Sequence, residues 1–599
     1  MCGIAAIFSY HPNATVVDSR ELRRIRDHML ARGPDGSGEW YSQDHKVGLA
    51  HRRLAIIDLS ESGAQPMLAE NGQLVISFNG EIYNYRELRQ TLERKGRVFK
   101  SQSDTEVLLH LYAEKGEAMV QDLRGMYAFA IWDARRCGLF LARDPFGIKP
   151  LYFADDGKSF RVASQVKALL AGGGIDTSPD AAGHVGFFLW GHVPEPHSLY
   201  RGIRALPAGS SLWVDRSGRN ASSFCRVTEI LAKAEEATDN VPAASVQETL
   251  RVALRDTVRH HLVADVPVGV FLSSGMDSTT LAALAAEEGG QLRTVTLGFT
   301  EFKGTLKDET LLAEQVARHY AADHQTIWVT RSDFASHRDR LFAAMDQPTI
   351  DGVNTYYVSL AARRASLKVA LSGLGGDELF GGYPSFRQIP RTATTLGVFN
   401  RFPRFGRAAR ILSAPVLKQL TSPKYAGLLE YGGTRGGAYL LRRGLFMPWE
   451  LPELMDGEMV RCGWQELQPL LRLEETVDGL RSPRLQVSAL ESCWYMRNQL
   501  LRDSDWASMA HSLEVRVPFV DLTLWKSVAP LIVGHNPVTK QDMARTPLKS
   551  LPSQVLNRRK TGFSIPVREW LMDGTGAFDR QERGFRPWAR IVHSQYWKN

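Results

Sequence analysis

The pattern of apolar residues changes part-way along the chain, and this change constrains the fold more than any other feature. Up to residue 215, short strand-like runs lie between turns rich in Gly, Asn or Asp, at 4–8, 47–50, 74–78, 128–132 and 139–142, with helical patterns at 20–30 and 85–95. Farther along, continuous apolar strands at 266–272, 293–299, 325–329 and 368–371 alternate with helical patterns at 278–287, 309–320 and 355–366. The two patterns predict different domains, as does the length of 599 residues, which is too great for one hydrophobic core.

The first pattern predicts a layered α+β domain with mostly antiparallel sheet, and the second predicts an α/β domain with a doubly wound parallel sheet. Residues 384–550 are mainly helical, so the second domain has a helical C-terminal part. Residues 216–245 show little apolar periodicity, which predicts a linker. The predicted units are therefore 1–215, the linker at 216–245, 246–575 and a C-terminal tail at 576–599.

The composition, with 44% hydrophobic and 23% charged residues, is ordinary for a globular protein, and no apolar run approaches a membrane span. The apolar stretch at 4–8 has no basic region before it, so it does not predict a signal peptide. Cys137, Cys225, Cys462 and Cys493 are scattered without the spacing of a metal site. We therefore predict a cytoplasmic protein with no membrane partner, in which Cys2 stays a free thiol.

The net charge of +8 and the isoelectric point of about 9.1 raise the question of nucleic-acid binding. The excess of Lys and Arg is mostly spread out, with one denser run at 401–410, and aromatic residues do not form a stacking platform with it. We therefore predict a solvated basic surface that attracts anionic substrates such as ATP, and no nucleic-acid partner.

Cys2 is a candidate nucleophile because it directly follows Met1. Cysteine is scarce, with five in the whole chain. A small second residue permits removal of Met1, which leaves a thiol and a free α-amine on one residue. This amine, with an ordinary pKa of about 7.7–8.0, can accept the thiol proton near neutral pH. The alternative is an arbitrary small residue after the start codon, and position alone leaves both open.

A second candidate site lies where the strand at 266–272 passes into a helix, in the segment Leu272-Ser273-Ser274-Gly275-Met276-Asp277-Ser278. Small residues there expose backbone N–H groups, and a helix N-terminus attracts phosphate. Asp277 would repel phosphate unless it held a cation, so we predict it as a Mg²⁺ ligand. A Walker A loop is absent. A simple strand-to-helix turn is the alternative.

A similar loop follows the strand at 368–371, with five glycines between 372 and 383 together with Asp377 and Glu378. Glycine permits close approach of the backbone to a ligand, whereas a flexible connection is the alternative. In a doubly wound sheet, ligands bind at the carboxyl ends of strands. Both loops occupy such ends, so we predict that they face one nucleotide and that Asp277 and Asp377 share magnesium.

These residues give nearly the whole chain a resemblance to asparagine synthetase of the glutamine-hydrolysing type. Residues 1–215 resemble its class II (N-terminal nucleophile) glutamine amidotransferase domain in six ordered motifs, at 1–4, 32–35, 51–54, 78–84, 103–106 and 143–147. Residues 246–575 resemble its ATP-pyrophosphatase type synthetase domain at 273–278, at 508–519 and at 560–563. The implied fold is an N-terminal nucleophile sandwich followed by a doubly wound ATP-pyrophosphatase domain.

The resemblance implies that Cys2 attacks the side-chain amide of glutamine, releases ammonia and leaves a γ-glutamyl thioester. Asn79 and the Gly80 N–H would form the oxyanion hole. The implied glutamine-binding residues are Arg53 for the carboxylate, and Glu81 and Asp104 for the ammonium group. Structural roles remain open, because Asn79-Gly80 is also a good hairpin turn and the charged residues could be solvated.

In the second domain the resemblance implies that ATP activates a carboxylate as an acyl-adenylate, and that ammonia from an internal tunnel then displaces AMP. The implied residues are Leu272, Ser273, Ser274, Gly275, Asp277, Ser278, Leu297, Ser372 and Gly373 for ATP, Lys560 for the phosphate charge, and Asp277 with Asp377 for Mg²⁺. Lys560 could also be a solvated lysine in a basic run. The family further implies a homodimer.

Two positions depart from the family pattern. Ser274 stands where glycine is usual. Leu374 stands where well-known asparagine synthetases carry a glutamate that handles ammonia or the acyl-adenylate, and leucine cannot accept a proton. We therefore predict an acceptor pocket containing Asp351, Leu374 and Glu378, in which Glu378 or Asp351 replaces that base.

The leading function is asparagine synthesis from aspartate, glutamine and ATP. Leu374 favours a first rival, the same mechanism with another acceptor, such as a sugar acid, a peptidoglycan precursor or a natural-product acid. A tRNA-modifying enzyme is a second rival, which the N-terminal glutaminase motifs disfavour. A non-catalytic regulatory protein is a third, and retention of Cys2, Asp277, Asp377 and Lys560 disfavours it.

Overall fold

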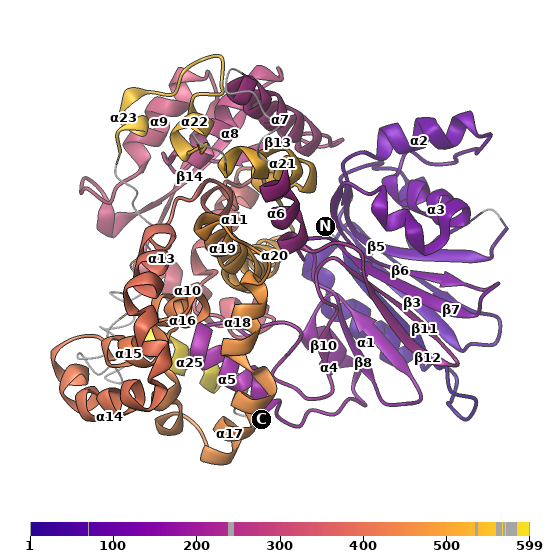
Figure 1. Ribbon diagram of the computed structural model, residues 1–599. Coiled ribbons are helices and arrows are strands. Elements are labelled where there is room, and N and C mark those ends of the chain that lie inside the picture. Colours follow the sequence, from indigo (N-terminus) through magenta and orange to yellow (C-terminus); the bar gives the residue numbers. More distant parts are fainter. Residues whose placement is uncertain are drawn as a thin grey trace.

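The computed structural model describes residues 2–69, 71–237, 245–533, 537–558, 566, 570 and 584–597, and in these residues the named strands form three sheets (Figure 1). Two antiparallel sheets belong to the first part of the chain. One has the order β10 (Arg204–Ala205), β8 (Tyr152–Asp155), β9 (Phe160–Ala163), β1 (Gly3–Phe8), β3 (Val47–Arg53), β2 (Gly36–Tyr41). The other has the order β12 (Gly218–Ser223), β11 (Ser210–Asp215), β7 (Gly138–Arg143), β6 (Gly125–Asp133), β5 (Leu74–Ile82), β4 (Met67–Leu68).

The two antiparallel sheets form a sandwich with helices on its outer faces. Side chains from both inner faces, among them Phe8, Val75 and Leu141, make one buried core between the sheets. The helices α1 (Ser19–His28) and α4 (Val166–Gly172) pack on the first sheet, and α2 (Tyr85–Arg94) and α3 (Asp104–Lys115) pack on the second. The predicted N-terminal nucleophile sandwich is confirmed, and α3 is a helix that the sequence patterns did not predict.

The third sheet is parallel and has the order β15 (Asp323–Val329), β14 (Arg293–Phe299), β13 (Val268–Phe271), β16 (Val369–Leu371), β17 (Glu514–Arg516). Helices α8 (Met276–Glu287), α9 (Thr310–His319), α10 (Arg331–Ala344) and α11 (Val353–Arg364) connect its strands. The predicted doubly wound domain is therefore confirmed. Because β13 and β16 are parallel neighbours, the two loops that follow them meet at one edge of the sheet.

The helical C-terminal part is confirmed as well. Its α-helices are α12 (Gly376–Phe380), α13 (Ser385–Leu396), α14 (Pro403–Leu420), α15 (Leu428–Tyr431), α16 (Arg435–Arg443), α17 (Gly457–Leu467), α18 (Pro469–Val477), α19 (Pro483–Leu490), α20 (Arg502–Met509), α21 (Leu522–Val528), α22 (Lys540–Ala544), α23 (Ser553–Leu556) and α25 (Arg586–Trp597). A π-helix, Glu491–Leu501, joins α19 to α20. Such helices are rare and are frequent at functional sites.

The predicted linker at 216–245 is wrong for much of its described part. Strand β12 pairs with β11, and helix α6 (Val227–Glu236) buries Val227, Ile230, Leu231 and Ala234. These positions have helical spacing, which the polar composition of the segment concealed. Helix α5 (Ala181–Trp190), which precedes it, packs among α17 and α25 (Figure 1). The domain boundaries themselves stay predictions.

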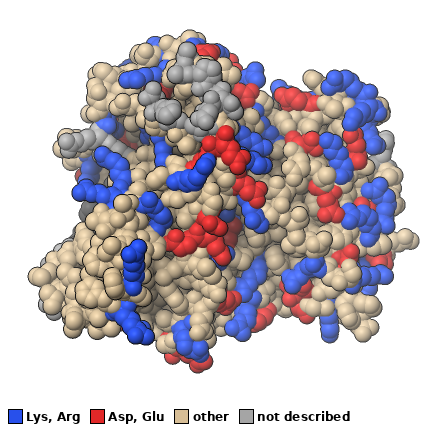
Figure 2. All heavy atoms as spheres, in the orientation of Figure 1, with Lys and Arg blue, Asp and Glu red and all other residues tan. Residues whose placement is uncertain are grey.

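The surface carries charges of both signs. Figure 2 shows Lys and Arg intermixed with Asp and Glu over much of one face, especially over the antiparallel sheets. No described helix is long and apolar enough to cross a membrane.

Candidate active sites

The first site forms where β1 and β5 bring Cys2 beside Asn79. The Cys2 backbone nitrogen donates a hydrogen bond to Asn79 Oδ1 at 2.8 Å, which holds the amide of this side chain in place. Asn79 Nδ2 is buried and has no hydrogen-bond partner within the described residues. A donor is therefore present beside the thiol for a developing oxyanion. Burial raises the pKa of the Cys2 thiol, so deprotonation requires a nearby base.

Gly80 follows directly and could not be another residue. Its φ is +152°, and a Cβ atom would lie 2.1 Å from the carbonyl oxygen of Met126. The Asn79-Gly80 pair lies within β5 and is not a hairpin turn. This placement excludes the structural alternative that the sequence left open for the pair.

A cavity of about 30 Å³ opens beside Cys2, and the predicted glutamine-binding residues Arg53, Glu81 and Asp104 line it. Asp104 begins α3 and accepts a hydrogen bond from the Ile82 N–H at 3.0 Å. Burial raises the pKa of Asp104 to about 6 and also raises that of Glu81. Two buried carboxyl groups in one small cavity are suited to a cationic group such as the glutamine ammonium.

Arg53 is the cationic side chain that lines this cavity, together with the two carboxyl groups. Its guanidinium donates to the backbone carbonyls of Asp58 and Ser60, the latter at 2.7 Å. Gly63 packs directly on it, because a Cβ there would lie 2.3 Å from the Arg53 Nη2 atom. These contacts hold a planar cation at the wall where a carboxylate could pair with it.

Buried ion pairs connect this site to the second part of the chain. Arg516, from β17, lies 3.4 Å from Glu81 and 2.6 Å from Glu514. All three residues are buried. Arg32 donates to the Cys2 carbonyl at 3.0 Å and pairs with Asp505 of α20 at 2.6 Å. Glu81 therefore pairs directly with the second part of the chain, and Cys2 is connected to it through Arg32.

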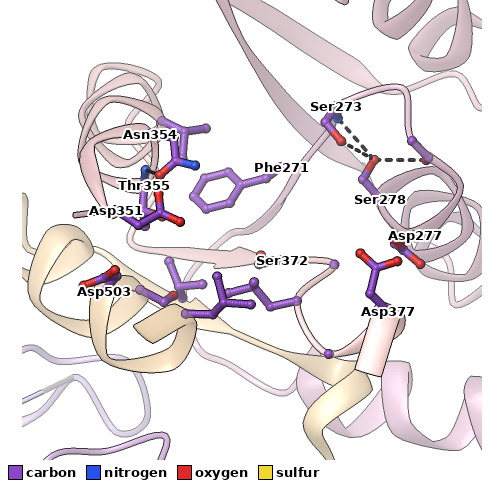
Figure 3. A pocket seen from close by; sticks show the side chains of 18 of the residues that line it. Phe271, Ser273, Asp277, Ser278, Asp351, Asn354, Thr355, Ser372, Asp377 and Asp503 are labelled. Carbon is purple, nitrogen blue, oxygen red and sulfur yellow. Dashed lines mark hydrogen bonds between the residues drawn. The ribbon is translucent and has the colours of Figure 1, made fainter. Parts of the chain in front are cut away.

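The second site is a cavity of about 280 Å³ at the carboxyl ends of β13 and β16. The predicted residues that line it are Leu272, Ser273, Gly275, Asp277, Ser278, Leu297, Asp351, Ser372, Gly373, Leu374, Asp377 and Glu378. Figure 3 shows Asp277 and Asp377 at one end, with Asp351 and Asp503 at the other. The Ser278 hydroxyl bonds the Ser273 N–H at 3.2 Å, which shapes the loop at the start of α8.

Ser274 has a different role from the predicted one. Its φ of +57° is in the left-handed region that favours glycine. Its hydroxyl donates to the Glu309 carbonyl at 2.8 Å, so the side chain is engaged with the chain before α9 and does not line the cavity. This hydrogen bond gives the serine hydroxyl a partner at a position where the family usually has glycine.

Two glycines of the second loop, Gly373 and Gly376, allow the two loops to approach each other closely. A Cβ at Gly373 would lie 2.9 Å from the Asp277 Cβ, and one at Gly376 would lie 2.6 Å from Asp277 Oδ1. Glycine is therefore required at these two positions because the backbone lies against the Asp277 side chain, whether or not a ligand is bound.

The two carboxylates predicted to share magnesium face one cation, the ammonium group of Lys540 on α22. Lys540 Nζ forms ion pairs with both Asp277 and Asp377. Burial opposes the charge on Lys540, but the two carboxylates raise its pKa above the ordinary value. The predicted Lys560 lies outside the described residues.

Three further carboxyl groups line this cavity, on Asp351, Glu378 and Asp503, and the last two residues are buried. Burial raises the pKa of Glu378 to about 8 and that of Asp503 to about 8. Glu378 Oε1 accepts from the Tyr383 hydroxyl at 2.9 Å, and its Oε2 has no hydrogen-bond partner within the described residues. Glu378 therefore titrates near pH 8 and has one buried oxygen that no described residue satisfies.

Two family models match the chain, a glutamine amidotransferase domain over residues 1–225 and an asparagine synthase over residues 249–590. The chain belongs to the asparagine synthase family. It is 33% identical over 583 residues to asparagine synthetase [glutamine-hydrolyzing] 1 of Bacillus subtilis (strain 168), covering 95% of this chain and 88% of that protein. It is 30% identical over 419 residues to amidase chry2 of Gibberella zeae, covering 65% of this chain and 60% of that protein.

A solved structure, described as the allosteric regulatory enzyme of purine biosynthesis, overlaps the chain with a TM-score of 0.30 at 18% identity, covering 55% of this chain and 80% of that one.

Several site residues of this family member escaped the sequence analysis. Arg516 and Glu514 lie in the segment 508–519 that resembles the family, but the sequence analysis predicted no role for them. Two charged residues within a short strand were the one sign that they could have a special role. Lys540 and Asp503 gave no signal, because only tertiary contact places them beside Asp277 and Asp351.

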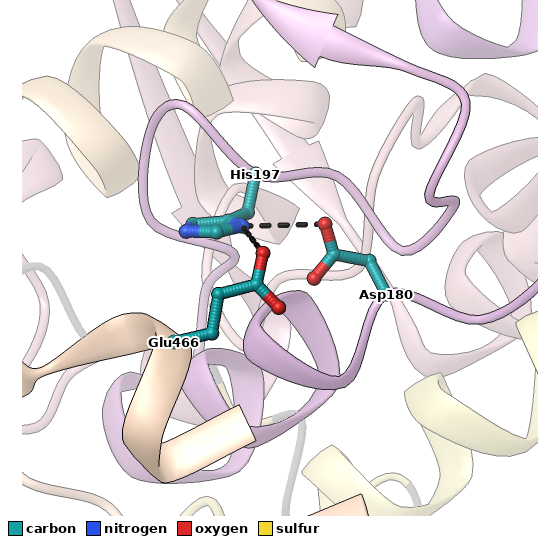
Figure 4. A group of neighbouring side chains, drawn as sticks. All are labelled: Asp180, His197 and Glu466. Atoms are coloured by element: carbon teal, nitrogen blue, oxygen red, sulfur yellow. Dashed lines mark hydrogen bonds and ion pairs between the residues drawn. The ribbon is translucent and has the colours of Figure 1, made fainter. Parts of the chain in front are cut away.

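One further group in the described chain has metal-ligand chemistry, Asp180, His197 and Glu466 (Figure 4). Arg204 pairs with Asp180 and, at 3.3 Å, with Glu466, and its Nη1 lies 2.8 Å from His197 Nδ1. The guanidinium already supplies the positive charge that these side chains require. The cluster therefore joins α5 to α17 as an ion-pair network.

Proposed function

We propose that this family member transfers the amide nitrogen of glutamine to a carboxyl group that ATP has activated as an acyl-adenylate. The observation that carries the proposal is the presence of both sites in one chain, with Arg516 between them. Its side chain pairs with Glu81, and its backbone carbonyl accepts from the Ser372 N–H at 2.8 Å in the nucleotide-site loop. A single residue therefore contacts the glutamine cavity and the ATP cavity.

At the first site, the Cys2 thiolate attacks the side-chain carbonyl carbon of glutamine. Asn79 Nδ2 and the Gly80 N–H stabilise the oxyanion, and collapse expels ammonia and leaves a thioester. The α-amine of Cys2, free after removal of Met1, takes the thiol proton and returns it to the leaving nitrogen. Water then hydrolyses the thioester to glutamate. Glu81 and Asp104 hold the glutamine ammonium, and Arg53 holds its carboxylate.

At the second site, a carboxylate oxygen of the acceptor attacks the α-phosphorus of ATP, and pyrophosphate leaves. Backbone N–H groups at the start of α8 face the phosphates, with Lys540 and Lys560 as cations. Ammonia then attacks the acyl carbon and AMP leaves. Glu378 takes the proton that the attacking nitrogen loses, in the carboxylate form that its pKa of about 8 makes predominant above that pH.

Asp277 and Asp377 are the residues that would hold Mg²⁺. Their carboxylate oxygens are the ligands that this ion prefers, and they already face a common cation, Lys540. Bound with ATP, the ion would neutralise charge on the departing pyrophosphate.

Aspartate is the first candidate acceptor. The relative named asparagine synthetase, which matches almost the whole chain, supports it, and the carboxyl groups of Asp351, Glu378 and Asp503 suit an α-ammonium group. A different carboxylate is the second candidate, favoured by two observations. Leu374 lines the cavity at the position where well-known asparagine synthetases carry a glutamate. No described Lys or Arg lines this cavity to pair with the α-carboxylate of aspartate.

We place the reaction in the cytoplasm. All five cysteines are free, including the buried Cys2, which a reducing compartment preserves.

The test is pyrophosphate release from ATP·Mg²⁺ by the purified chain with glutamine and a panel of carboxylic acids. Release that depends on aspartate supports the first acceptor, and release with another acid supports the second. Cys2→Ala should lose glutamine-dependent product by roughly 10³-fold or more while keeping ammonium-dependent product. Absence of release with every acid, from protein that still hydrolyses glutamine, would refute the proposal.

A further inference from the structure

A second cavity, of about 180 Å³, adjoins the ATP cavity at the end where Asp351 lies. Asp351 lines both cavities. The shared wall also contains Tyr383 on the first side and Tyr495 on the second, with ring centroids 6.1 Å apart. Arg443 stacks over both rings, at 4.7 and 3.8 Å. An acceptor whose carboxyl group reaches the ATP would therefore extend its body toward this second cavity.

Five aromatic side chains line the second cavity, together with the charged side chains of Asp351 and Arg443. Trp190 comes from α5, Tyr439 from α16, and Trp494 with Tyr495 from the π-helix. The Trp190 and Trp494 rings lie 5.6 Å apart at 47° and present flat apolar surfaces. Such surfaces suit a ring more than a short flexible chain.

Two of the residues that line the cavity, Trp190 and His192, each carry a buried polar atom that no described residue satisfies. His192 Nδ1 lies 3.2 Å from Gln499 Oε1, and because a carbonyl oxygen only accepts, Nδ1 carries the proton. Burial lowers the pKa of His192 to about 3, so the ring is neutral and Nε2 is an acceptor. His192 Nε2 and the Trp190 Nε1–H are buried without hydrogen-bond partners among the described residues. Because a hydroxyl group both donates and accepts, a ligand that carries hydroxyl groups offers a partner to each of these atoms.

We infer that the second cavity binds the body of the acceptor, and that this acceptor is a carboxylic acid carried on a hydroxylated ring, as in a uronic acid. The inference rests on the proposed acyl-adenylate function and specifies its substrate.

The kinetic test uses ammonium chloride, ATP·Mg²⁺ and four probes: glucuronate, galacturonate, cyclohexanecarboxylate and aspartate. A uronate should give pyrophosphate release with the lowest KM. His192→Phe should raise that KM about tenfold, the value of one lost hydrogen bond, while kcat changes little and cyclohexanecarboxylate, which has no hydroxyl groups, is unaffected. Glutamine hydrolysis should stay at the wild-type rate, which shows that the variant is folded.

The binding test is quenching of tryptophan fluorescence by the uronate. Trp494→Phe should lose much of the response, whereas the matched Trp449→Phe, outside both cavities, should keep it. Release with aspartate alone, with a KM that His192→Phe leaves unchanged, would overturn the inference and preserve the proposed function. Release with no acid at all would refute both.

A different observation concerns the outer helix α14, which exposes an apolar face to solvent. Phe405, Leu412, Val416 and Leu420 recur at intervals of seven, four and four residues, so they lie on one side of the helix. Their exposed fractions are 54%, 79%, 57% and 72%. Figure 1 shows α14 at the outer edge of the helical part, away from both sites.

The same region is strongly basic. Between Glu378 and Glu430 the sequence contains eight Lys and Arg residues and no Asp or Glu, a charge equal to the +8 of the whole chain. Arg401, Arg404 and Arg407 are exposed on or beside α14. A helix with a basic face and an exposed apolar face is typical of segments that lie in the interface of an anionic membrane.

The structure assigns α14 as a docking surface for an anionic lipid bilayer, which revises the prediction of no membrane partner. A second copy of the chain fits less well, because like charges would meet across the interface. The aliphatic side chains Leu412, Val416 and Leu420 likewise offer nucleic acid no ring to stack upon.

The test is co-sedimentation of the full chain with phosphatidylcholine vesicles containing either no or 30% phosphatidylglycerol. Binding to the anionic vesicles should weaken at least about tenfold in the variant L412D/V416D and at raised salt. The matched control Leu306→Asp, at another site that is 98% exposed, should bind like the wild type. Equal sedimentation with both vesicles, none with either, or a dimer that L412D/V416D dissociates would overturn the assignment.

Discussion

The guanidinium of Arg516 lies 3.4 Å from the carboxylate of Glu81, although the two residues belong to different parts of the chain. Arg516 also donates to the carbonyls of His261 and Val263, at 2.7 and 2.6 Å. A cation with this many buried partners is specific in geometry, so lysine would not reproduce its contacts.

Replacement of Arg516 by Met should therefore destabilise the protein by about 3–5 kcal/mol, because it leaves buried carboxylates without their cation. Thermal unfolding measures this loss. Arg516→Lys keeps the charge and should fold better, but glutamine hydrolysis should exceed pyrophosphate release because the contact between the sites is altered. Unchanged stoichiometry in a folded Arg516→Lys enzyme would mean that the contact is structural alone.

Asn79→Ala should lower kcat for glutamine hydrolysis by roughly 10²–10³-fold, the cost of one oxyanion donor. Asn79→Asp keeps an oxygen for the Cys2 N–H and removes only the donor, so it should be impaired to a similar degree. Both variants should retain ammonium-dependent synthesis. If Asn79→Asp hydrolysed glutamine at the wild-type rate, the donor role would be excluded.

Asp104 should make glutamine binding sensitive to pH. Because burial raises its pKa to about 6, the carboxylate that attracts the glutamine ammonium is present above pH 6 and is lost as the pH falls through that value. The KM for glutamine should then rise by up to about tenfold per pH unit below 6. Asp104→Asn should raise KM at neutral pH and remove this dependence, and ammonium-dependent synthesis serves as the control.

Glu378 should control the pH dependence of the amidation step. Its pKa of about 8 means that the carboxylate form appears as the pH rises through 8, so the rate with glutamine as nitrogen donor should rise over that range. Glu378→Gln should lower this rate by roughly 10²–10⁴-fold and abolish the pH-dependent limb. If the rate of Glu378→Gln still rose with pH in this way, another residue would be the base, and Asp351→Asn would be the next variant to measure.

Lys540→Met should remove ATP-dependent chemistry, because Asp277 and Asp377 would face each other without the cation between them. We expect a loss of roughly 10²–10³-fold in pyrophosphate release, with glutamine hydrolysis unchanged. Lys307→Met, an exposed position, is the matched control. An Mg²⁺ titration adds a second readout, since added Mg²⁺ should partly restore activity if the ion and the ammonium group share these carboxylates.

The sequence predicted the fold well in segments whose apolar residues recur with the spacing of a single kind of element, either a strand or a helix. Alternating strands and helices predicted the parallel sheet, and the glycine and serine loops predicted where its ligand cavity lies. Helix α6 was missed although Val227, Ile230, Leu231 and Ala234 have helical spacing, because polar residues and a proline nearby dominated the composition.

Site residues were predictable where they belong to a local motif, such as Cys2 or Asp277. Lys540 was not, because 263 residues separate it from Asp277 and only the packing of α22 brings them together. Ser274 shows the converse, since the loop was recognised correctly while its hydroxyl turned out to bond Glu309. Long-range contact and side-chain direction are the two properties that local patterns do not contain.

Arg32 binds the carbonyl of the nucleophile with one edge and Asp505 with the other. In a hybrid that joined the first domain of one family member to the second domain of another, the arginine that holds the Cys2 backbone would therefore depend on an acidic partner from the foreign half. Recombination between members should succeed only where the acidic partner at position 505 is exchanged together with position 32, so the two halves are expected to have been inherited as one unit.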